Sequence, residues 1–149
     1  MENEELDIVE EAEKPYNIRQ RCFHFYKDVI MLIRESKYDK IYYSLFDQLI
    51  RSSTSIGANM VEGGAGSTNK DFINFMHISL KSANETKYWL CLIKEITQVN
   101  IDKANGLIGE ANEISKIIAS IILNAKKKQF QILHFSFCII MKRMNYQKS

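Results

Sequence analysis

The stretch that decides the fold is RSSTSIGANMVEGGAGSTNKDFINFMHISLKSANE, residues 51–85. Two segments with apolar residues at helical spacing flank a short glycine-rich run, residues 63–66. Glycine is unfavourable inside helices but suits the turn between two of them. The stretch therefore predicts the end of one helix, a tight loop, and the start of a second helix antiparallel to the first.

Capping signals bound the helices on either side of this loop. We expect the first helix to end at Glu62, with Gly63 in the left-handed conformation that closes many helices. Ser67 or Thr68 should cap the second helix, because a short hydroxyl side chain can accept from the free N–H groups of a first turn. This second helix should extend to about residue 97.

Another helix is expected before the central stretch. Apolar residues recur at helical spacing from Ile18 to Ile33, which predicts a helix over residues 16–36. Pro15 suits the first turn of this helix because that turn needs no backbone N–H from it. Asp39 should then cap the helix that leads into the central stretch.

A last helix is expected near the end of the chain. Isoleucine and alanine residues from Ile108 to Ala125 share one broad apolar face, and Asp102 should cap the helix that carries them. The helix should end in the lysines at 126–128, which suit the negative end of a helix dipole. A face this broad indicates burial against a second subunit as well as within the bundle. Four helices with short connections predict an all-α fold, an antiparallel up-down-up-down four-helix bundle.

Three regions follow from this pattern. Residues 1–14 are predicted to be an acidic disordered tail, because they hold few large apolar side chains. Residues 15–128 form the four-helix bundle. Residues 129–149 are a C-terminal extension with an apolar run from Phe130 to Met141. A fifth element covering a subunit face, a β-like segment and a poorly ordered tail all fit this run.

Charge is divided unevenly along the chain. The formal net charge is +2, but residues 1–14 hold seven acids and one base, which leaves 19 bases and 11 acids in residues 15–149. A basic body suggests a polyanionic partner. A well-solvated surface explains the same excess, and an acidic tail could screen the body or compete with nucleic acid for it.

Several classes of protein are disfavoured. Cys22, Cys91 and Cys138 are far apart and fit neither a metal site nor a disulfide framework, so we expect a cytoplasmic protein. His77 and His134 have no acidic or cysteine partner at ligand spacing, so we expect no metal and no cofactor. We expect no secretory signal, because the N-terminus is acidic, and no membrane span, because no apolar run is long enough.

Polar residues in the central stretch suggest how its two helices align. The helix before the loop carries four of them, spaced by four, four and three: Arg51, Ser55, Asn59 and Glu62. On the following helix, Ser82 and Glu85 share a face. Long helical side chains lean toward their own N-terminus, which brings Arg51 and Glu85 toward each other near Ser82. We therefore predict a wholly or partly buried Arg51–Glu85 ion pair that sets the register of the two helices.

The combination of these residues resembles a known family. The pattern stands here as Arg51, Ser55-Ile56, Asn59-Met60-Val61, Glu62-Gly63, Ser67, Lys70 and Phe72, continued by Phe75, Ser82 and Glu85. It resembles the four-helix-bundle family encoded within intervening sequences of bacterial 23S rRNA genes, which looks related to the accessory variability determinant of diversity-generating retroelements. The resemblance covers about residues 18–125. Two departures are Gly57, where the family often has proline, and a 64–66 loop without a basic residue.

The resemblance implies a homo-oligomer, specifically a homopentamer, with a nucleic-acid-associated role and no known catalysis. The residues themselves agree that an enzyme is not expected. Residues 62–67 lack the strand and the Gly-Lys-Ser/Thr ending of a phosphate-binding loop, although Ser67 and Lys70 could contact an anion at the helix start. Arg19 and His24 resemble the Arg-x4-His motif of HEPN ribonucleases, but five residues on a helix separate their directions.

Basic residues lie on the predicted outer faces of two helices and at the end of the last helix: Arg19, Lys27, Arg34, Lys70, Lys81, Lys87, Lys94, Lys126, Lys127 and Lys128. Repeated around a ring, they would grip phosphate backbones with little sequence preference. The sequence thus predicts a non-catalytic oligomer that binds RNA, DNA or a nucleoprotein. A protein-binding scaffold without nucleic-acid binding is the alternative, and a HEPN-like ribonuclease a remote one.

Overall fold

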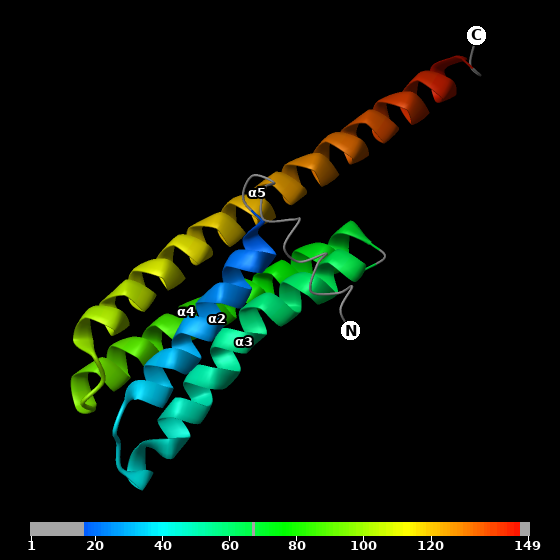
Figure 1. The fold of residues 1–149 in the computed structure, drawn as a ribbon. Helices are drawn as coiled ribbons and strands as arrows, with labels where there is room; N and C mark the ends of the chain where they lie inside the picture. The colour runs from blue at the N-terminus through cyan, green and yellow to red at the C-terminus, as the bar shows by residue number, and fades with distance from the viewer. Residues whose placement is uncertain (1–16, 67, 147–149) are drawn as a thin grey trace, which may run out of the picture.

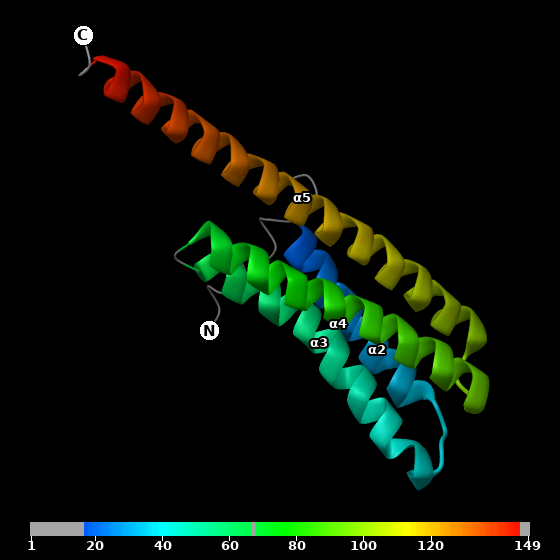
Figure 2. The ribbon, with the colours of Figure 1, turned by 180° about the vertical axis from the view of Figure 1, so that it is seen from behind.

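Four long helices and one short 3-10 helix make up the computed structural model, which describes residues 17–66 and 68–146. The elements are α2 (Ile18–Glu35), η2 (Lys40–Tyr42), α3 (Tyr43–Ala65), α4 (Asn69–Ile96) and α5 (Ile101–Tyr146). Each helix packs antiparallel to the next, and α5 closes the bundle against α2 (Figure 1 and, from behind, Figure 2). The predicted all-α four-helix bundle is confirmed. The predicted tail at 1–14, together with Pro15 and Ser67, lies outside the described residues.

One apolar core runs along the inside of the bundle. The helical spacing places one buried stripe on each helix, and the stripes meet on the bundle axis. Their largest fully buried members are Phe25 and Leu32 from α2, Leu49, Ile56 and Met60 from α3, Leu90 and Ile93 from α4, and Ile114 and Ile118 from α5. Each such side chain contributes about 1.5–3 kcal/mol by leaving water. The predicted apolar faces are therefore the ones that build the core.

Two helices start later than expected. Asn17 caps α2, because its side chain accepts from the N–H of Arg19 at 3.0 Å. The capping role expected of Asp39 is wrong. Its carbonyl accepts from the N–H of Tyr42 at 3.0 Å, closing the η2 turn, and its side chain makes no capping bond, so α3 starts later at Tyr43.

The loop between α3 and α4 is shorter than expected. α3 continues through Gly63 to Ala65, so the expected end at Glu62 and the left-handed Gly63 are wrong. Gly63 is instead a buried helical residue, and a Cβ atom there would lie only 2.8 Å from the Cβ of Phe75. Its lack of a side chain lets α3 and α4 approach closely. Thr68 caps α4 as expected, accepting from the N–H of Asp71 at 3.1 Å.

Small hydroxyl side chains, not an ion pair, join α3 to α4. The predicted Arg51–Glu85 pair is wrong: Arg51 is exposed and bonds Asp47 on its own helix at 2.9 Å, while Glu85 accepts from the indole N–H of Trp89 at 3.2 Å. Ser82 instead donates to the hydroxyl of Ser55 at 2.9 Å. Serines at the contact leave no room for long side chains, so these turn outward.

Asn59 and a second serine complete this contact. The amide of Asn59 donates to the carbonyl and the hydroxyl of Ser55, at 2.7 and 2.9 Å. The hydroxyl of Ser79, fully buried, donates to the carbonyl of Ile56 at 2.7 Å. Every polar group that faces the α3–α4 contact at these positions is therefore paired, which is the condition for burying it at little cost.

The last helix is longer than expected and projects beyond the bundle. Asn100, not Asp102, caps it, because the side chain of Asn100 accepts from the N–H of Lys103 at 2.9 Å. The expected end at lysines 126–128 is wrong: α5 runs on to Tyr146, as the sequence has neither glycine nor proline after Gly109. A β-like segment at residues 129–146 is thereby excluded. Within residues 17–66 and 68–146, none of the helices is long and apolar enough to cross a membrane.

Candidate nucleic-acid interface

The predicted basic residues fall into one cluster and several scattered positions. All of them lie on described helices, where Lys87 and Lys94 are half-buried and the others are exposed. Five gather at the end of the bundle that holds the α3–α4 turn: Arg19, Lys70, Lys126, Lys127 and Lys128. We call these five the basic end. They come from three helices that are distant in sequence.

Arg19 enters the basic end from the first turn of α2. Its guanidinium lies against Gly64, so closely that a Cβ atom on Gly64 would collide with it. The positive side chain therefore lies beside the last turn of α3, where the backbone carbonyls carry partial negative charge. Glycine at 64 leaves room for the guanidinium in this position.

The lysines enter from α4 and α5, which touch at this level. The amide of Asn69, the first residue of α4, donates to the carbonyl of Ala125 on α5 at 3.5 Å. Lys70 follows Asn69, and Lys126–Lys128 follow Ala125, so the contact brings both groups to one end of the bundle. Among the α5 side chains whose burial the structure describes, Ala125 is the last buried one, and the three lysines directly follow it.

Few acids share the basic end. Glu62 on the last turns of α3 is exposed, and Asp71 is held by Thr68, whose hydroxyl donates to its carboxylate at 2.5 Å. Asp71 also lies in the first turn of α4, where its negative charge interacts favourably with the positive end of the helix dipole. An anion at the helix start would therefore meet a carboxylate. The arrangement favours phosphate contacts through the lysines rather than through the N–H groups of α4, and Ser67 lies outside the described residues.

The other predicted basic residues are not part of this cluster. Lys27 sits over the ring of Phe23, 5.9 Å from its centroid. Lys94 bonds Asn105 at 3.3 Å and lies 3.6 Å from Glu95, near the opposite end. Arg34 also belongs to that end, and Lys81 and Lys87 lie along the middle of α4. In one chain, five of the predicted basic residues thus lie toward the end that holds the α3–α4 turn, and the others lie elsewhere along the bundle.

Arg19 and His24 do not form a joined pair. Arg19 lies against Gly64, whereas the exposed ring of His24 stands edge-on to Phe23, with ring centroids 6.0 Å apart. The structure records no hydrogen bond between the two side chains. Among the residues it describes, no group of three or more His, Cys, Asp or Glu is placed to hold a metal ion.

One ion pair has no signal in the sequence. Arg21 on α2 forms a two-pronged contact with Glu110 on α5, with Nη2 to Oε2 at 2.7 Å and a second bond from Nε to Oε1. Both side chains are about one-quarter to one-third exposed. The hydrogen bond to Glu110 raises the pKa of Arg21 above its usual value. Arg21 and Glu110 are 89 residues apart, so no local pattern reveals the pair.

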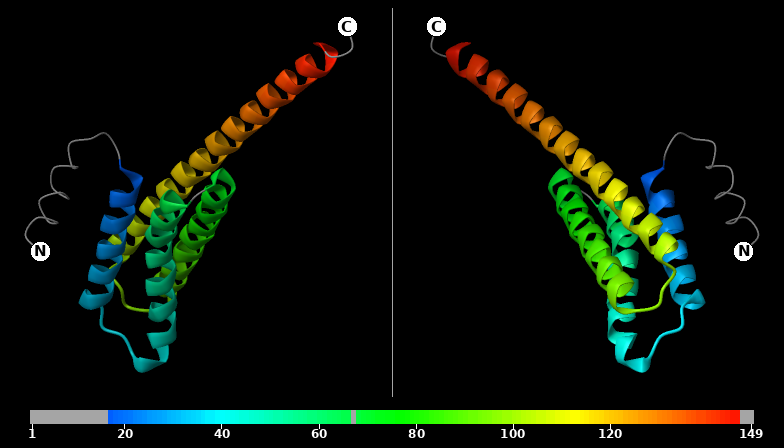
Figure 3. Two further views of the ribbon diagram at one scale, coloured as in Figure 1. Left: turned by 90° about the vertical axis from the view of Figure 1, so that its right-hand side faces the viewer. Right: turned by 90° about the vertical axis from the view of Figure 1, so that its left-hand side faces the viewer.

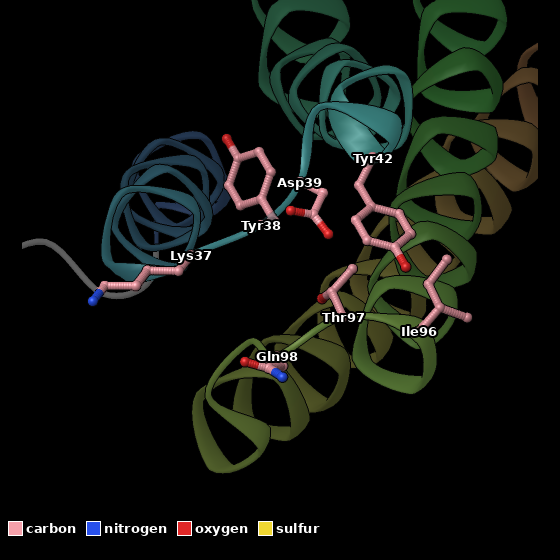
Figure 4. Close-up of a pocket in the computed structure, with 7 residues that line it drawn as sticks. All are labelled: Lys37, Tyr38, Asp39, Tyr42, Ile96, Thr97 and Gln98. Atoms are coloured by element: carbon pink, nitrogen blue, oxygen red, sulfur yellow. The ribbon is translucent and has the colours of Figure 1, made fainter.

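A second feature that the sequence did not single out is a hollow at the opposite end. It measures about 380 Å³ and lies where the connection before α3 meets the turn after α4 (Figure 4). Its lining is Lys37, Tyr38, Asp39, Tyr42, Ile96, Thr97 and Gln98. Tyr38 is held there by stacking on Phe46, with centroids 3.9 Å apart. Mixed charge and wide opening distinguish this hollow from the basic end.

Fold and site together define a small helical-bundle protein with a cationic end. The chain belongs to the family described as 23S rRNA-intervening sequence protein, whose sequence pattern matches residues 14–120. This confirms the resemblance to that family, while the relation to the accessory variability determinant stays a prediction. No curated protein matches the chain.

A solved structure supports the same assignment. It is a protein of unknown function from the S23 ribosomal protein family of Bacteroides thetaiotaomicron VPI-5482. The two chains are 32% identical and superpose with a TM-score of 0.63. The match covers 98% of that chain but 71% of this one.

Proposed function

We propose that this protein is a non-catalytic, homo-oligomeric bundle that binds the phosphate backbone of RNA or DNA. The observation that carries the proposal is the gathering of Arg19, Lys70 and Lys126–Lys128 at one end of the bundle. Lysine and arginine side chains that neutralise phosphates release counterions, which favours binding to any sequence. The family name, which refers to 23S rRNA genes, is consistent with a nucleic-acid setting.

Exposed apolar side chains support self-association. Phe23 and Met31 on α2 and Ile78 and Tyr88 on α4 are each 45–59% exposed. Large apolar side chains gathered on outer faces are typical of surfaces that another subunit covers. We propose a homopentamer in the cytoplasm, in which each subunit contributes one basic end. Native mass spectrometry of the full chain tests this, and a monomer at micromolar concentration would contradict it.

The binding test is a titration of fluorescent single- and double-stranded RNA and DNA at two salt concentrations. The test variant carries Lys126→Gln, Lys127→Gln and Lys128→Gln. The control carries Arg34→Gln, Lys37→Gln and Lys40→Gln, which removes equal charge from the opposite end. For a single strand, loss of three phosphate contacts should reduce the slope of log affinity against log salt by about 2. The control should retain most of the slope.

Three results would contradict the proposal. Absence of polynucleotide binding at low salt would exclude it and favour the scaffold alternative, for which the exposed apolar side chains also argue. An equal loss of polynucleotide affinity in both variants would show that binding depends on net charge and not on the basic end. RNA cleavage that disappears in His24→Ala would instead support the ribonuclease alternative and contradict a non-catalytic role.

A further inference from the structure

The C-terminal part of α5 projects beyond the rest of the bundle (Figure 3). We call residues 126–146 the C-terminal arm. Residues 126–136 are all exposed, whereas α5 before them supplies buried residues up to Ala125. Four large apolar side chains of the arm are exposed to solvent, each by 63–71%: Phe130, Ile132, Leu133 and Phe135. Such a concentration indicates a surface that something covers.

The arm carries bases and no acid. It holds five bases, three of which are the consecutive lysines at its start, and residues 147–149 add a sixth base, Lys148. Residues 1–14, which we call the acidic segment, hold seven acids and one base. Residues 126–149 therefore carry a net charge of +6 and residues 1–14 a net charge of −6, while the 111 residues between them carry only +2. Nearly all of the charge asymmetry of the chain lies in these two pieces.

The acidic segment also offers apolar side chains. Leu6, Ile8, Val9 and Ala12 are interspersed among its acids. Apolar contacts with Phe130 and Leu133 would accompany ion pairs with the lysines. A docked acidic segment would thus neutralise positive charge on the arm and cover its exposed apolar side chains.

The length of the chain lets the acidic segment reach the arm. The Arg21–Glu110 pair fixes the level of α2 on α5, and Lys126 lies 16 residues beyond Glu110, about 24 Å along the helix. Asn17 lies four residues beyond Arg21 in the same direction, about 6 Å, because the helices are antiparallel. About 18 Å of axial distance remains, and fourteen extended residues span up to roughly 46–50 Å.

We propose that the acidic segment docks on the C-terminal arm of its own chain, with its carboxylates on Lys126–Lys128 and its apolar side chains on Phe130 and Leu133. Because these lysines belong to the basic end, the docked segment would act as an internal competitor for polyanions. That consequence rests on the proposed function, whereas the docking itself does not.

The docking is tested first without nucleic acid. A zero-length carbodiimide cross-linker is applied to the full chain, prepared as an equal mixture of ¹⁴N- and ¹⁵N-labelled protein. We expect links from carboxylates of residues 1–14 to Lys126–Lys128, within single isotopic species. Links of comparable yield to Lys37 and Lys40, at the opposite end, would show that the acidic segment contacts lysines without preference and would overturn the proposal. Links between the two isotopic species would assign the contact to a second copy and also overturn it.

Hydrogen exchange provides the second measurement. Amides of residues 129–136 should exchange about tenfold more slowly in the full chain than in a variant whose seven acids are replaced by Gln and Asn, since covering an exposed helix suppresses its local opening. The variant keeps the length and apolar residues of the segment, so only charge changes. Exchange in α3 serves as an internal control and should be equal in both. Equal exchange at 129–136 would contradict the docking.

The consequence for polyanions is separable. With docking established, deletion of residues 2–14 should strengthen polynucleotide binding, and the gain should vanish when Lys126–Lys128 are replaced by Gln. A chain that shows cross-links and protection but binds no polynucleotide would retain the docking and overturn the proposed function. A chain that binds polynucleotide but shows neither cross-links nor protection would retain the proposed function and overturn the docking.

Discussion

Ser82 on α4 donates a hydrogen bond to Ser55 on α3 at 2.9 Å, and this contact occupies the place where an Arg51–Glu85 ion pair was expected. Ser82 also lies 3.0 Å from the carbonyl of Ile78, one turn earlier on its own helix. Ser55 in turn accepts from Asn59. A chain of short polar side chains therefore joins the two helices at the centre of the family pattern.

Removing this contact should cost measurable stability. Ser82→Ala should lower the free energy of unfolding by about 1 kcal/mol, because Ser55 loses its partner on the other helix. Arg51→Ala should change it by less than about 0.5 kcal/mol, since Arg51 pairs only with Asp47 on an exposed surface. Urea denaturation followed by circular dichroism measures both. A larger loss in Arg51→Ala than in Ser82→Ala would contradict the assignment of register to the serines.

Glycine has opposite roles at two helical positions. Gly63→Ala should destabilise the protein by about 1–3 kcal/mol, because the new Cβ would lie 2.8 Å from the Cβ of Phe75. Gly106→Ala should stabilise it by about 0.5–1 kcal/mol, because alanine favours the helix and a Cβ there meets nothing within 4 Å. The two substitutions are chemically identical, so they control for each other. Equal effects in thermal denaturation would exclude the close helix approach at Gly63.

The Arg21–Glu110 pair should contribute modestly to stability. Glu110→Gln should cost about 1 kcal/mol at low salt, since the pair is two-pronged but remains partly exposed to solvent. The loss should shrink as salt is added, because screening weakens the native pair. Lys116→Gln, which breaks the exposed pair with Glu113 on one helix, should leave stability unchanged. A salt-independent loss in Glu110→Gln would assign its effect to packing instead of charge.

Cys22 should be unreactive and should make stability fall in alkali. Burial is the main cause that raises the pKa of Cys22 to about 12, and the charge of Glu110 adds to it. Because the folded-state pKa lies above the ordinary value of 9.0, the unfolded thiol releases its proton first. The contribution is fully present below pH 9 and is lost as pH rises toward 12.

Alkylation with peptide-level mass spectrometry checks this. Iodoacetamide at pH 8 should label the exposed Cys91 and spare Cys22 until the protein is unfolded. Cys22→Ser should reduce the alkaline loss of stability between pH 9 and 12. Rapid labelling of Cys22 in the folded protein would contradict its burial against Met60, whose sulfur lies 3.7 Å away.

Local pattern determined much of this protein. The spacing of apolar residues along each helix predicted the stripes that carry Phe25, Ile56 and Ile114 into the core, because a helical face is defined by residues three and four apart. The helix cap at Thr68 was equally predictable from the sequence, because the hydrogen bond that forms it spans only three residues. The family pattern, and with it the bundle, followed from the same short segment.

Tertiary structure alone decided how the helices meet. Three features depend on the distance and rotation between helices, which no spacing within one helix encodes. They are the close approach at Gly63, the Ser55–Ser82 contact and the Arg21–Glu110 pair. The same holds for the basic end, because Arg19, Lys70 and Lys126 come together only when α2, α3, α4 and α5 pack. Helix formation is a local property of the chain, whereas register and surface clusters arise from contacts between residues distant in sequence.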